Sequence, residues 1–346
     1  MEQKKPTLLS EIGEFGLIDR LTSHRKTLHA SSIKGVGDDA AVIDVGDHCM
    51  LVTTDLLVEG IHFNLIYTPL KHLGYKAVAV NLSDIYAMNG VPKQITVSIA
   101  VSGKFSLEAL EELYSGIYMA CDKYEIDLVG GDTSSSVTGL TISITAIGVA
   151  LKDEIVYRSG ACVNDLICVS GDLGAAYAGL QLLEREKALF EKDPSLQPDL
   201  EGHDYIVARQ LKPEPREDII RLLRENHILP TSMIDISDGL SSEILHICKN
   251  SEVGCRIYQE KIPIDHTTAM MAAEFNIEPL ICALHGGEDY ELLFTVPLKD
   301  FEKLRDMKEI HIIGKILDKD EKALMVTPEG NTVQLRAQGW DGLAER

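Results

Sequence analysis

The chain has 346 residues, of which 45% are hydrophobic and 25% are charged. This composition is typical of a globular protein, and the length fits two domains of roughly 150 residues each. The formal net charge of −21 argues against nucleic acid and anionic membranes as partners, because both repel an acidic surface.

Helix-like and strand-like segments alternate along the chain, and the pattern restarts near residue 155. In the first half we expect helix 8–21, strands 40–45 and 50–56, helix 69–89, strand 94–102, helix 106–123, and strands 127–130 and 140–151. The second half should contain strand 165–169, a helix from about 175, a polar loop over 188–203, helix 216–226, strand 232–236, helix 240–249, and strands 289–296 and 310–316. The predicted fold class is α/β (α+β), with an N-terminal domain over 1–153 and a C-terminal domain over 154–346.

The cysteine pattern bears on where the protein works. The seven cysteines are scattered and include no CxxC pair, which argues against a disulfide framework and against a zinc site. Residues 1–10 contain no apolar segment of signal-peptide length, and no apolar run approaches the ~20 residues that span a bilayer. We therefore expect a cytoplasmic protein.

Aspartates recur at the ends of apolar segments, next to glycine or small hydroxyl residues. They occur in Gly37-Asp38-Asp39, Thr53-Thr54-Asp55, Asn81-Leu82-Ser83-Asp84, Gly130-Gly131-Asp132-Thr133 and Asp235-Ile236-Ser237-Asp238-Gly239. Each alone could be a turn residue or a helix cap. Five such clusters favour a cation site, because grouped carboxylates repel one another unless a cation neutralises them. Oxygen-only ligands suit Mg²⁺ better than zinc or copper.

The spacing within two of these clusters indicates which side chains face the same way. On an extended strand Thr53 and Asp55 share one face, and Thr54 faces the other. On the helix predicted over 69–89, Asn81 and Asp84 lie on one side.

Other nucleotide-binding and catalytic motifs do not fit the sequence. It contains no GxxxxGK[ST] loop and no HExxH, GxSxG or HRD signature. Residues 35–40 imitate GxGxxA, but a strand is predicted after them instead of a helix, and two carboxylates would face the pyrophosphate. A dinucleotide site is therefore excluded.

The clusters, in this order, resemble the thiamine-monophosphate kinase family of the aminoimidazole ribonucleotide synthetase superfamily. The resemblance covers nearly the whole chain. It includes Gly13-Glu14-Phe15, Gly37-Asp38-Asp39-Ala40, Thr53-Thr54-Asp55, Lys76-Ala77-Val78-Ala79-Val80-Asn81-Leu82-Ser83-Asp84, Gly130-Gly131-Asp132-Thr133, Asp235-Ile236-Ser237-Asp238-Gly239, Gly286-Gly287-Glu288-Asp289-Tyr290-Glu291 and Gly339-Trp340-Asp341. The resemblance implies a two-domain subunit with mixed sheets packed with helices, and a homodimer joined through the N-terminal domains.

The resemblance also implies roles for individual residues. The implied ligands of several Mg²⁺ ions are Asp39, Asp55, Asp84, Asp132 and Asp235, with Thr53, Thr54 and Asp238 as further candidates. The implied ATP contacts are Tyr114, Gly131, Asp132, Arg158 and Ser237, with Tyr118 as the alternative to Tyr114. The implied contacts to thiamine monophosphate are His62, Glu288 and Trp340. Taken alone, His62 and Trp340 also fit core positions.

The acceptor implied by the resemblance determines the expected mechanism. A phosphate monoester, whose second pKa is about 6, is already a nucleophile at neutral pH, so no catalytic general base is expected. The expected reaction is ATP-dependent phosphorylation of thiamine monophosphate to thiamine diphosphate. The alternatives are another ATP-dependent synthetase of the superfamily, and a non-catalytic protein that binds divalent cations or nucleotides. Selenophosphate synthetases carry an N-terminal reactive cysteine or selenocysteine, whereas no cysteine precedes Cys49 here.

Overall fold

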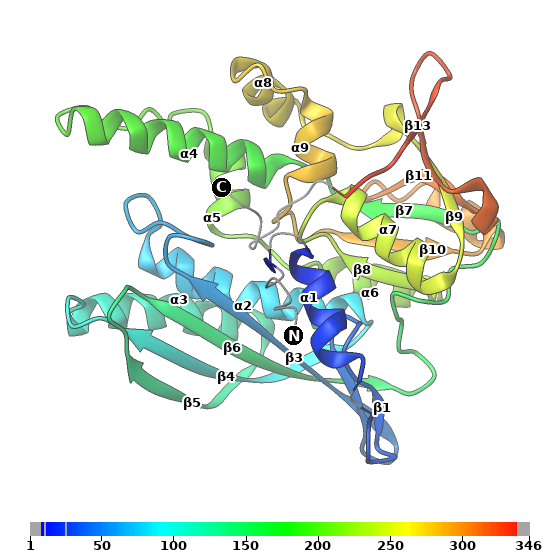
Figure 1. The fold of residues 1–346 in the computed structure, drawn as a ribbon, viewed down its shortest axis with the longest axis horizontal. Coiled ribbons are helices and arrows are strands. Elements are labelled where there is room, and N and C mark those ends of the chain that lie inside the picture. The colour runs from blue at the N-terminus through cyan, green and yellow to red at the C-terminus, as the bar shows by residue number, and fades with distance from the viewer. Residues whose placement is uncertain (1–7, 10–11, 25, 338–346) are drawn as a thin grey trace, which may run out of the picture.

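The computed structural model describes residues 8–9, 12–24 and 26–337. Two mixed β-sheets, each packed with helices, form the body of the molecule (Figure 1). This arrangement confirms the predicted fold class. The first sheet uses strands between residues 32 and 151, and the second uses strands between residues 166 and 334. The proposed boundary at residues 153/154 falls between them.

The first sheet has six strands in the order β1-β2-β3-β6-β4-β5, of which only the pair β4–β5 is parallel. Its strands are β1 (Ser32–Lys34), β2 (Ala41–Asp44), β3 (His48–Val58), β4 (Val91–Val101), β5 (Asp127–Ser135) and β6 (Thr141–Leu151). Helices α2 (Leu70–Ala87) and α3 (Leu107–Tyr124) lie together along one side of this sheet (Figure 1). Helix α1 (Gly13–Thr22) contacts the second half of the chain, where the ring centroids of Phe15 and His246 lie 4.4 Å apart.

The second sheet has seven strands in the order β13-β12-β9-β11-β7-β10-β8, of which only β12–β9 is parallel. Its strands are β7 (Leu166–Ser170), β8 (Ser232–Asp235), β9 (Gly254–Tyr258), β10 (Leu292–Val296), β11 (Ile310–Leu317), β12 (Ala323–Val326) and β13 (Thr332–Gln334). Its helices are α4 (Ala175–Lys192), α5 (Asp204–Leu211), α6 (Glu217–Glu225), α7 (Leu240–Ser251), α8 (His266–Glu274), α9 (Pro279–His285) and α10 (Phe301–Leu304).

Helix α2 joins the two halves of the molecule. It packs on β3, β4 and β6 of the first sheet and also contacts β8 of the second. Residues of both halves belong to one hydrophobic core, including Leu73, Ile85, Met233 and Phe294. Because nearly every residue from 73 to 87 is buried, α2 has little amphipathic character and is recognised by its length and its Pro69 N-cap position.

Local sequence signals predicted several boundaries well. Ser106, at the predicted start of the helix over 106–123, caps α3, with its hydroxyl accepting a hydrogen bond from the Ala109 backbone N–H. Three predictions were wrong in extent. The strand predicted over 289–296 begins only at Leu292 as β10, because Tyr290 has a φ of +52°, which an extended strand does not allow. The strand predicted to end at Gly130 continues as β5 to Ser135, because the parallel ladder with β4 runs on through a register shift at Ile95/Thr96. The loop predicted over 188–203 is helical up to Lys192, because α4 continues.

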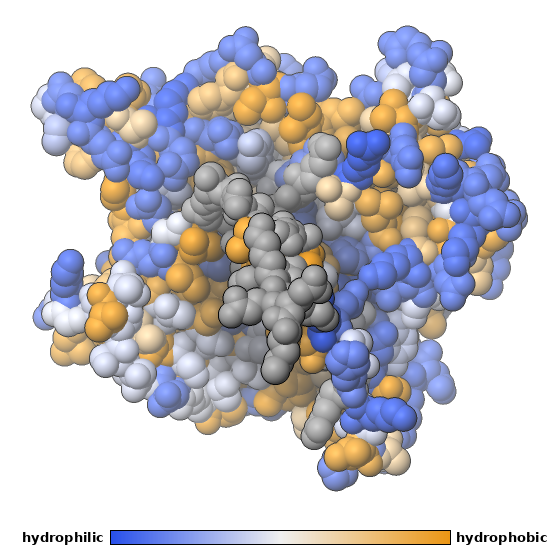
Figure 2. Space-filling model, in the orientation of Figure 1, coloured by the Kyte–Doolittle hydropathy of each residue, from blue (hydrophilic) through white to orange (hydrophobic). Residues whose placement is uncertain are grey.

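Hydrophilic and hydrophobic residues are unevenly distributed over the face of the molecule that Figure 2 shows. Figure 2 shows hydrophilic residues along much of the edge of this face, with hydrophobic residues in separate groups between them. Within the described residues, none of the helices has both the length and the apolar character that crossing a membrane requires.

The crossing of α2 and α3 gives the first prediction. A Cβ atom on Gly116 would overlap the backbone carbonyl of Lys71, and one on Gly74 would overlap the carbonyl of Leu113. We expect Gly116→Ala to destabilise the fold by about 1–3 kcal/mol, because neither backbone can move away without disturbing the core. A lower thermal unfolding midpoint by circular dichroism would show this. Gly103→Ala is the control, since its Cβ meets nothing within 4 Å, and equal midpoints for the two variants would contradict the prediction.

Candidate active site

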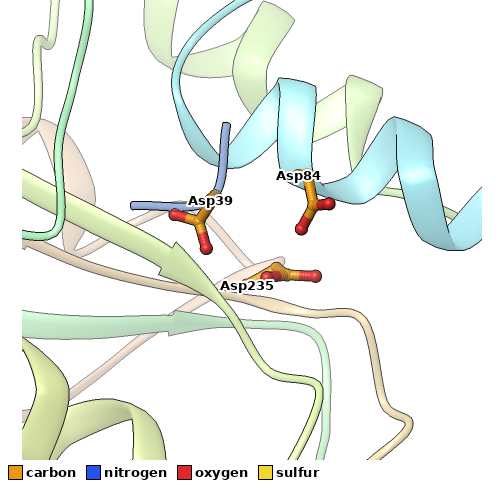
Figure 3. A group of neighbouring side chains, drawn as sticks. All are labelled: Asp39, Asp84 and Asp235. Carbon is orange, nitrogen blue, oxygen red and sulfur yellow. The ribbon is translucent and has the colours of Figure 1, made fainter. Parts of the chain in front are cut away.

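Three aspartates from distant parts of the chain meet between the two sheets. Asp39 precedes β2, Asp84 lies on α2, and Asp235 ends β8. Figure 3 shows their carboxylates pointing toward one another. One oxygen from each lies within 4.8 Å of the others. The sequence prediction that separate carboxylates converge therefore holds for these three residues.

Neighbouring side chains fix these carboxylates in place. The Thr53 hydroxyl donates to Asp84 Oδ2 at 2.5 Å, and the Ser83 hydroxyl donates to Asp235 Oδ2 at 2.6 Å. The backbone N–H of Asp55 donates to Asn81 Oδ1 at 3.0 Å, which ties β3 to α2. As the alternation of the strand predicted, Thr53 and Asp55 face α2.

Burial makes the ionised form of these carboxyl groups unfavourable. Burial raises the pKa of Asp39 to about 7 and that of Asp55 and Asp235 to about 6. The pKa of Asp84 lies well above its usual range, first because the carboxyl is buried and then because Asp55, Asp235 and Asp39 surround it. The folded protein therefore holds like charges together in a place where water cannot screen them.

Arg158 balances part of this charge. Its guanidinium donates to Asp39 Oδ1 through Nε at 3.0 Å and through Nη2 at 2.6 Å. The other carboxylate oxygen of Asp39 is buried and has no hydrogen-bond partner. Asp38 takes no part in the cluster, since its carboxylate accepts from the Arg158 backbone N–H and pairs with Lys34.

The donor set fits a hard cation. It consists of carboxylate and hydroxyl oxygens, one buried Asp39 oxygen lacks a partner, and the acids outnumber the single arginine beside them. Oxygen ligands of this kind suit Mg²⁺. A divalent cation would also offset the repulsion that raises the carboxyl pKa values.

The cluster lies in a cavity of about 860 Å³ that continues toward His62 and Glu288. Glu288 Oε2 accepts from Lys76 Nζ at 2.8 Å and from Gln210 Nε2 at 2.7 Å. His62 Nδ1 accepts from the Val58 backbone N–H at 3.0 Å, and burial lowers the pKa of His62, which favours the neutral ring. Thus His62 and Glu288 share the cavity with the carboxylate cluster.

Ser237 and Asp238 also line the cavity. Both follow β8 directly, so they extend the strand end that carries Asp235. The Asp238 backbone N–H donates to Glu243, a buried acid on α7. The Ser237 carbonyl accepts from the Glu288 backbone N–H at 2.7 Å, which connects the two ends of the cavity.

Four predicted site residues differ from the cluster in position. Thr54 lines the cavity, but its Oγ1 donates to the Ile144 carbonyl of β6 and does not face the cluster. Gly131 and Asp132 are exposed on the edge strand β5, and Tyr114 packs on α3 with Tyr118. None of Gly131, Asp132 and Tyr114 lines this cavity. Trp340 falls outside the described residues.

The structure adds residues to which no role was given. Lys76, Gln210, Ser83 and Glu243 all contact predicted site residues. Lys76 had a visible signal, because it is a charged residue in the apolar stretch of α2. Gln210 and Glu243 had none, since polar residues on helices are usually solvated.

Comparisons with known proteins give a consistent result. Residues 37–150 match the family described as AIR synthase related protein, N-terminal domain. The Aquifex aeolicus thiamine-monophosphate kinase is 36% identical, with the match covering 87% of this chain and 92% of that protein. The Bacillus subtilis thiamine-monophosphate kinase is 34% identical, with 95% and 98% covered.

Solved structures agree with these relatives. The structure "AaThiL complexed with AMPPCP and TMP" superposes with a TM-score of 0.82 at 31% identity, covering 98% of this chain and 99% of that one. Hydrogenase maturation protein HypE in complex with ATP superposes with a TM-score of 0.69 at 19% identity, covering 98% and 100%. At that identity the second likeness concerns the fold alone.

The buried carboxylates predict a variant that is more stable than the natural chain. We expect Asp84→Asn to raise the unfolding midpoint of metal-free protein at pH 8, because the amide keeps an acceptor for Thr53 without the charge. The folded pKa of Asp84 is raised, so its carboxylate costs nothing below the unfolded pKa and costs more as pH rises toward the folded value. The gain should therefore be larger at pH 8 than at pH 5.

Calorimetry in a chelating buffer would measure these midpoints. A difference of 1 kcal/mol corresponds to about 2–4 °C in a chain of 150–250 residues, and somewhat less in a longer one. The prediction would be wrong if Asp84→Asn lowered the unfolding midpoint at pH 8, or if the rise in the midpoint were larger at pH 5 than at pH 8.

Proposed function

The chain belongs to the thiamine-monophosphate kinase family, and from that premise we propose that it transfers the γ-phosphoryl group of ATP to thiamine monophosphate, giving thiamine diphosphate and ADP. The observation that carries the proposal is the single cavity with the Asp39–Asp84–Asp235 cluster at one end and Glu288 at the other. The related structure described with AMPPCP and TMP, an ATP analogue and a phosphate acceptor, supports the same pair of substrates.

Asp39, Asp84 and Asp235, together with Thr53, Asp55 and Asp238, hold several Mg²⁺ ions in this proposal. When bound, Mg²⁺ supplies the positive charge that lets two polyanionic substrates approach and shields the charge of the transferring group. The protein contributes rigid placement of the ligands, because Thr53, Ser83 and Arg158 already hold their carboxylates. Thr54 and Asp132 remain weaker candidates, given their positions on β3 and β5.

The transfer itself needs no general base. An oxygen of the acceptor phosphate forms a bond to the γ-phosphorus in line with the bond that breaks, and ADP leaves with the bridging oxygen. The acceptor phosphate is mostly dianionic above its second pKa of about 6, so it has no proton that must be removed. Arg158 and Ser237, which line the cavity near the cluster, bind the ATP phosphates in this proposal.

The opposite end of the cavity binds the thiamine part. Glu288 accepts hydrogen bonds from the aminopyrimidine or balances the thiazolium charge, and the neutral His62 ring packs beside it. Trp340 completes this part of the site in the proposal by stacking on a flat cationic ring.

We assign metal and ATP binding mainly to residues 1–153, with Arg158, Asp235, Ser237 and Asp238 contributed by residues 154–346, which complete the acceptor site. We also propose that the working unit is a homodimer. Gly131 and Asp132 lie on the exposed edge strand β5, so their role in ATP binding depends on a second copy, and the same holds for Tyr114. β5 is an edge strand of the first sheet and exposes Val129 to 57%, and an unpaired strand edge can pair with another chain.

We place the reaction in the cytoplasm, where reducing conditions suit a chain whose described cysteines are all free thiols. The net charge of −21 fits small-molecule substrates that arrive with cations, and it disfavours nucleic acid as a partner.

A product assay tests the proposed reaction. Full-length protein with ATP, Mg²⁺ and thiamine monophosphate should yield thiamine diphosphate and ADP in equal amounts, resolved by chromatography. Asp84→Asn should reduce turnover by at least about 100-fold, because removing one carboxylate weakens the cation site. A higher rate with free thiamine than with thiamine monophosphate would overturn the acceptor assignment, and turnover unchanged by chelation would overturn the role of Mg²⁺.

Light scattering after gel filtration tests the homodimer. The natural chain should have twice the mass of one 38.1 kDa subunit. Val129→Lys should shift the mass toward one subunit, because it places a charge on the exposed edge of β5. Leu298→Lys, a change of similar exposure in the second half, is the control and should leave the mass unchanged. A single-subunit mass for the natural chain would exclude the dimer.

A further inference from the structure

Lys76 is an unusual residue for the interior of this protein. It lies on α2 inside a run of apolar residues, and its side chain is 3% exposed. Its ammonium group donates to Glu288 Oε2 at 2.8 Å and to the Gln210 carbonyl at 3.0 Å. A buried ammonium group without partners is strongly unfavourable, so Glu288 and Gln210 must stay in place around Lys76.

The backbone conformation of the loop that carries Glu288 depends on contacts from the surrounding residues. Gly287, Glu288 and Tyr290 all have φ between +52° and +69°, a region that residues other than glycine rarely occupy. A conformation of this kind persists only where the surrounding structure over-determines it. Two backbone bonds from the loop to Ser237 and Ile236 hold it at one side, and the contacts of Lys76 and Gln210 to Glu288 hold it at the other.

The same face of α2 reaches the carboxylate cluster. Lys76, Val80 and Asp84 are spaced at i, i+4 and i+8, so they lie along one stripe of the helix. Val80 and Asp84 line the cavity, and Lys76 bonds to Glu288, which also lines it. Eight residues of α-helix span about 12 Å. The helix therefore sets a fixed distance between the cluster and Glu288.

We propose that Lys76 is a positioning residue: it orients the Glu288 carboxylate, and Glu288 contacts the acceptor. The face of α2 from Lys76 to Asp84 then fixes the separation between Glu288 and the metal-binding end of the cavity. This inference rests on the proposed function. It predicts that disturbing Lys76 weakens recognition of the acceptor and leaves recognition of ATP nearly intact, because Lys76 touches only the Glu288 end.

Steady-state kinetics of full-length variants test the inference. Lys76→Gln keeps a hydrogen-bond donor without the charge and should raise the KM for thiamine monophosphate about tenfold or more, with the KM for ATP and kcat changed by less than about threefold. Lys76→Arg keeps the cation and should restore part of the loss. Glu288→Gln should also raise the KM for thiamine monophosphate and leave the KM for ATP nearly unchanged. The double variant Lys76→Gln/Glu288→Gln should have a KM for thiamine monophosphate no higher than that of the more impaired single variant.

Lys123→Met is the matched control. Lys123 also pairs with a glutamate of the second half, Glu214, at 2.6 Å, but away from the cavity. It should leave both KM values within about twofold. Equal rises in the two KM values for Lys76→Gln, or additive losses in the double variant, would assign Lys76 a merely structural role. If Lys76→Gln does not fold, Lys76→Arg is measured instead. A remaining rise confined to the KM for thiamine monophosphate supports the inference, and equal rises in both KM values overturn it. An inactive natural chain would overturn the proposed function, whereas an active chain with unselective variants overturns only this inference.

Discussion

The structure depends on like charges held close together inside the molecule. Asp39, Asp84 and Asp235 approach within 4.8 Å of one another where burial removes the screening of water. Such an arrangement is stable only because specific partners hold each carboxylate: Arg158 on Asp39, Thr53 on Asp84 and Ser83 on Asp235. These partners orient the acids without neutralising them fully, which leaves the cluster ready for a hard cation.

Helix α2 is the element on which the cluster is built. Close contact with α3 through Gly74 and Gly116 locks it against the first sheet, and its far side meets β8 of the second. A rigid helix between two sheets can present Asp84 to one end of the cavity and Lys76 to the other. Because α2 is buried, its polar residues require hydrogen-bond partners from other parts of the chain.

A second set of contacts joins the two halves away from the site. Glu214, in the connection between α5 and α6, accepts hydrogen bonds from Tyr75 on α2 and from Lys123 and Tyr124 on α3. These bonds hold its pKa at about 2 in spite of its partial burial. Gln210, which contacts Glu288, lies on α5 just before this connection, whereas neither Glu214 nor Lys123 lines the cavity. The bonds of Glu214 therefore join the two halves outside the site.

The sequence by itself determined what short-range patterns encode. Periodicity indicated most of the strands and helices, the Ser106 cap marked the start of α3, and strand alternation separated Thr53 and Asp55 from Thr54. Tertiary structure alone decided which aspartates meet: Asp39, Asp84 and Asp235 converge, whereas Asp132 lies on an exposed edge strand. It also paired Lys76 with Glu288 across 212 residues. The physical reason is that periodicity and capping act within a few residues, whereas a contact between distant segments exists only after the sheets and α2 have packed.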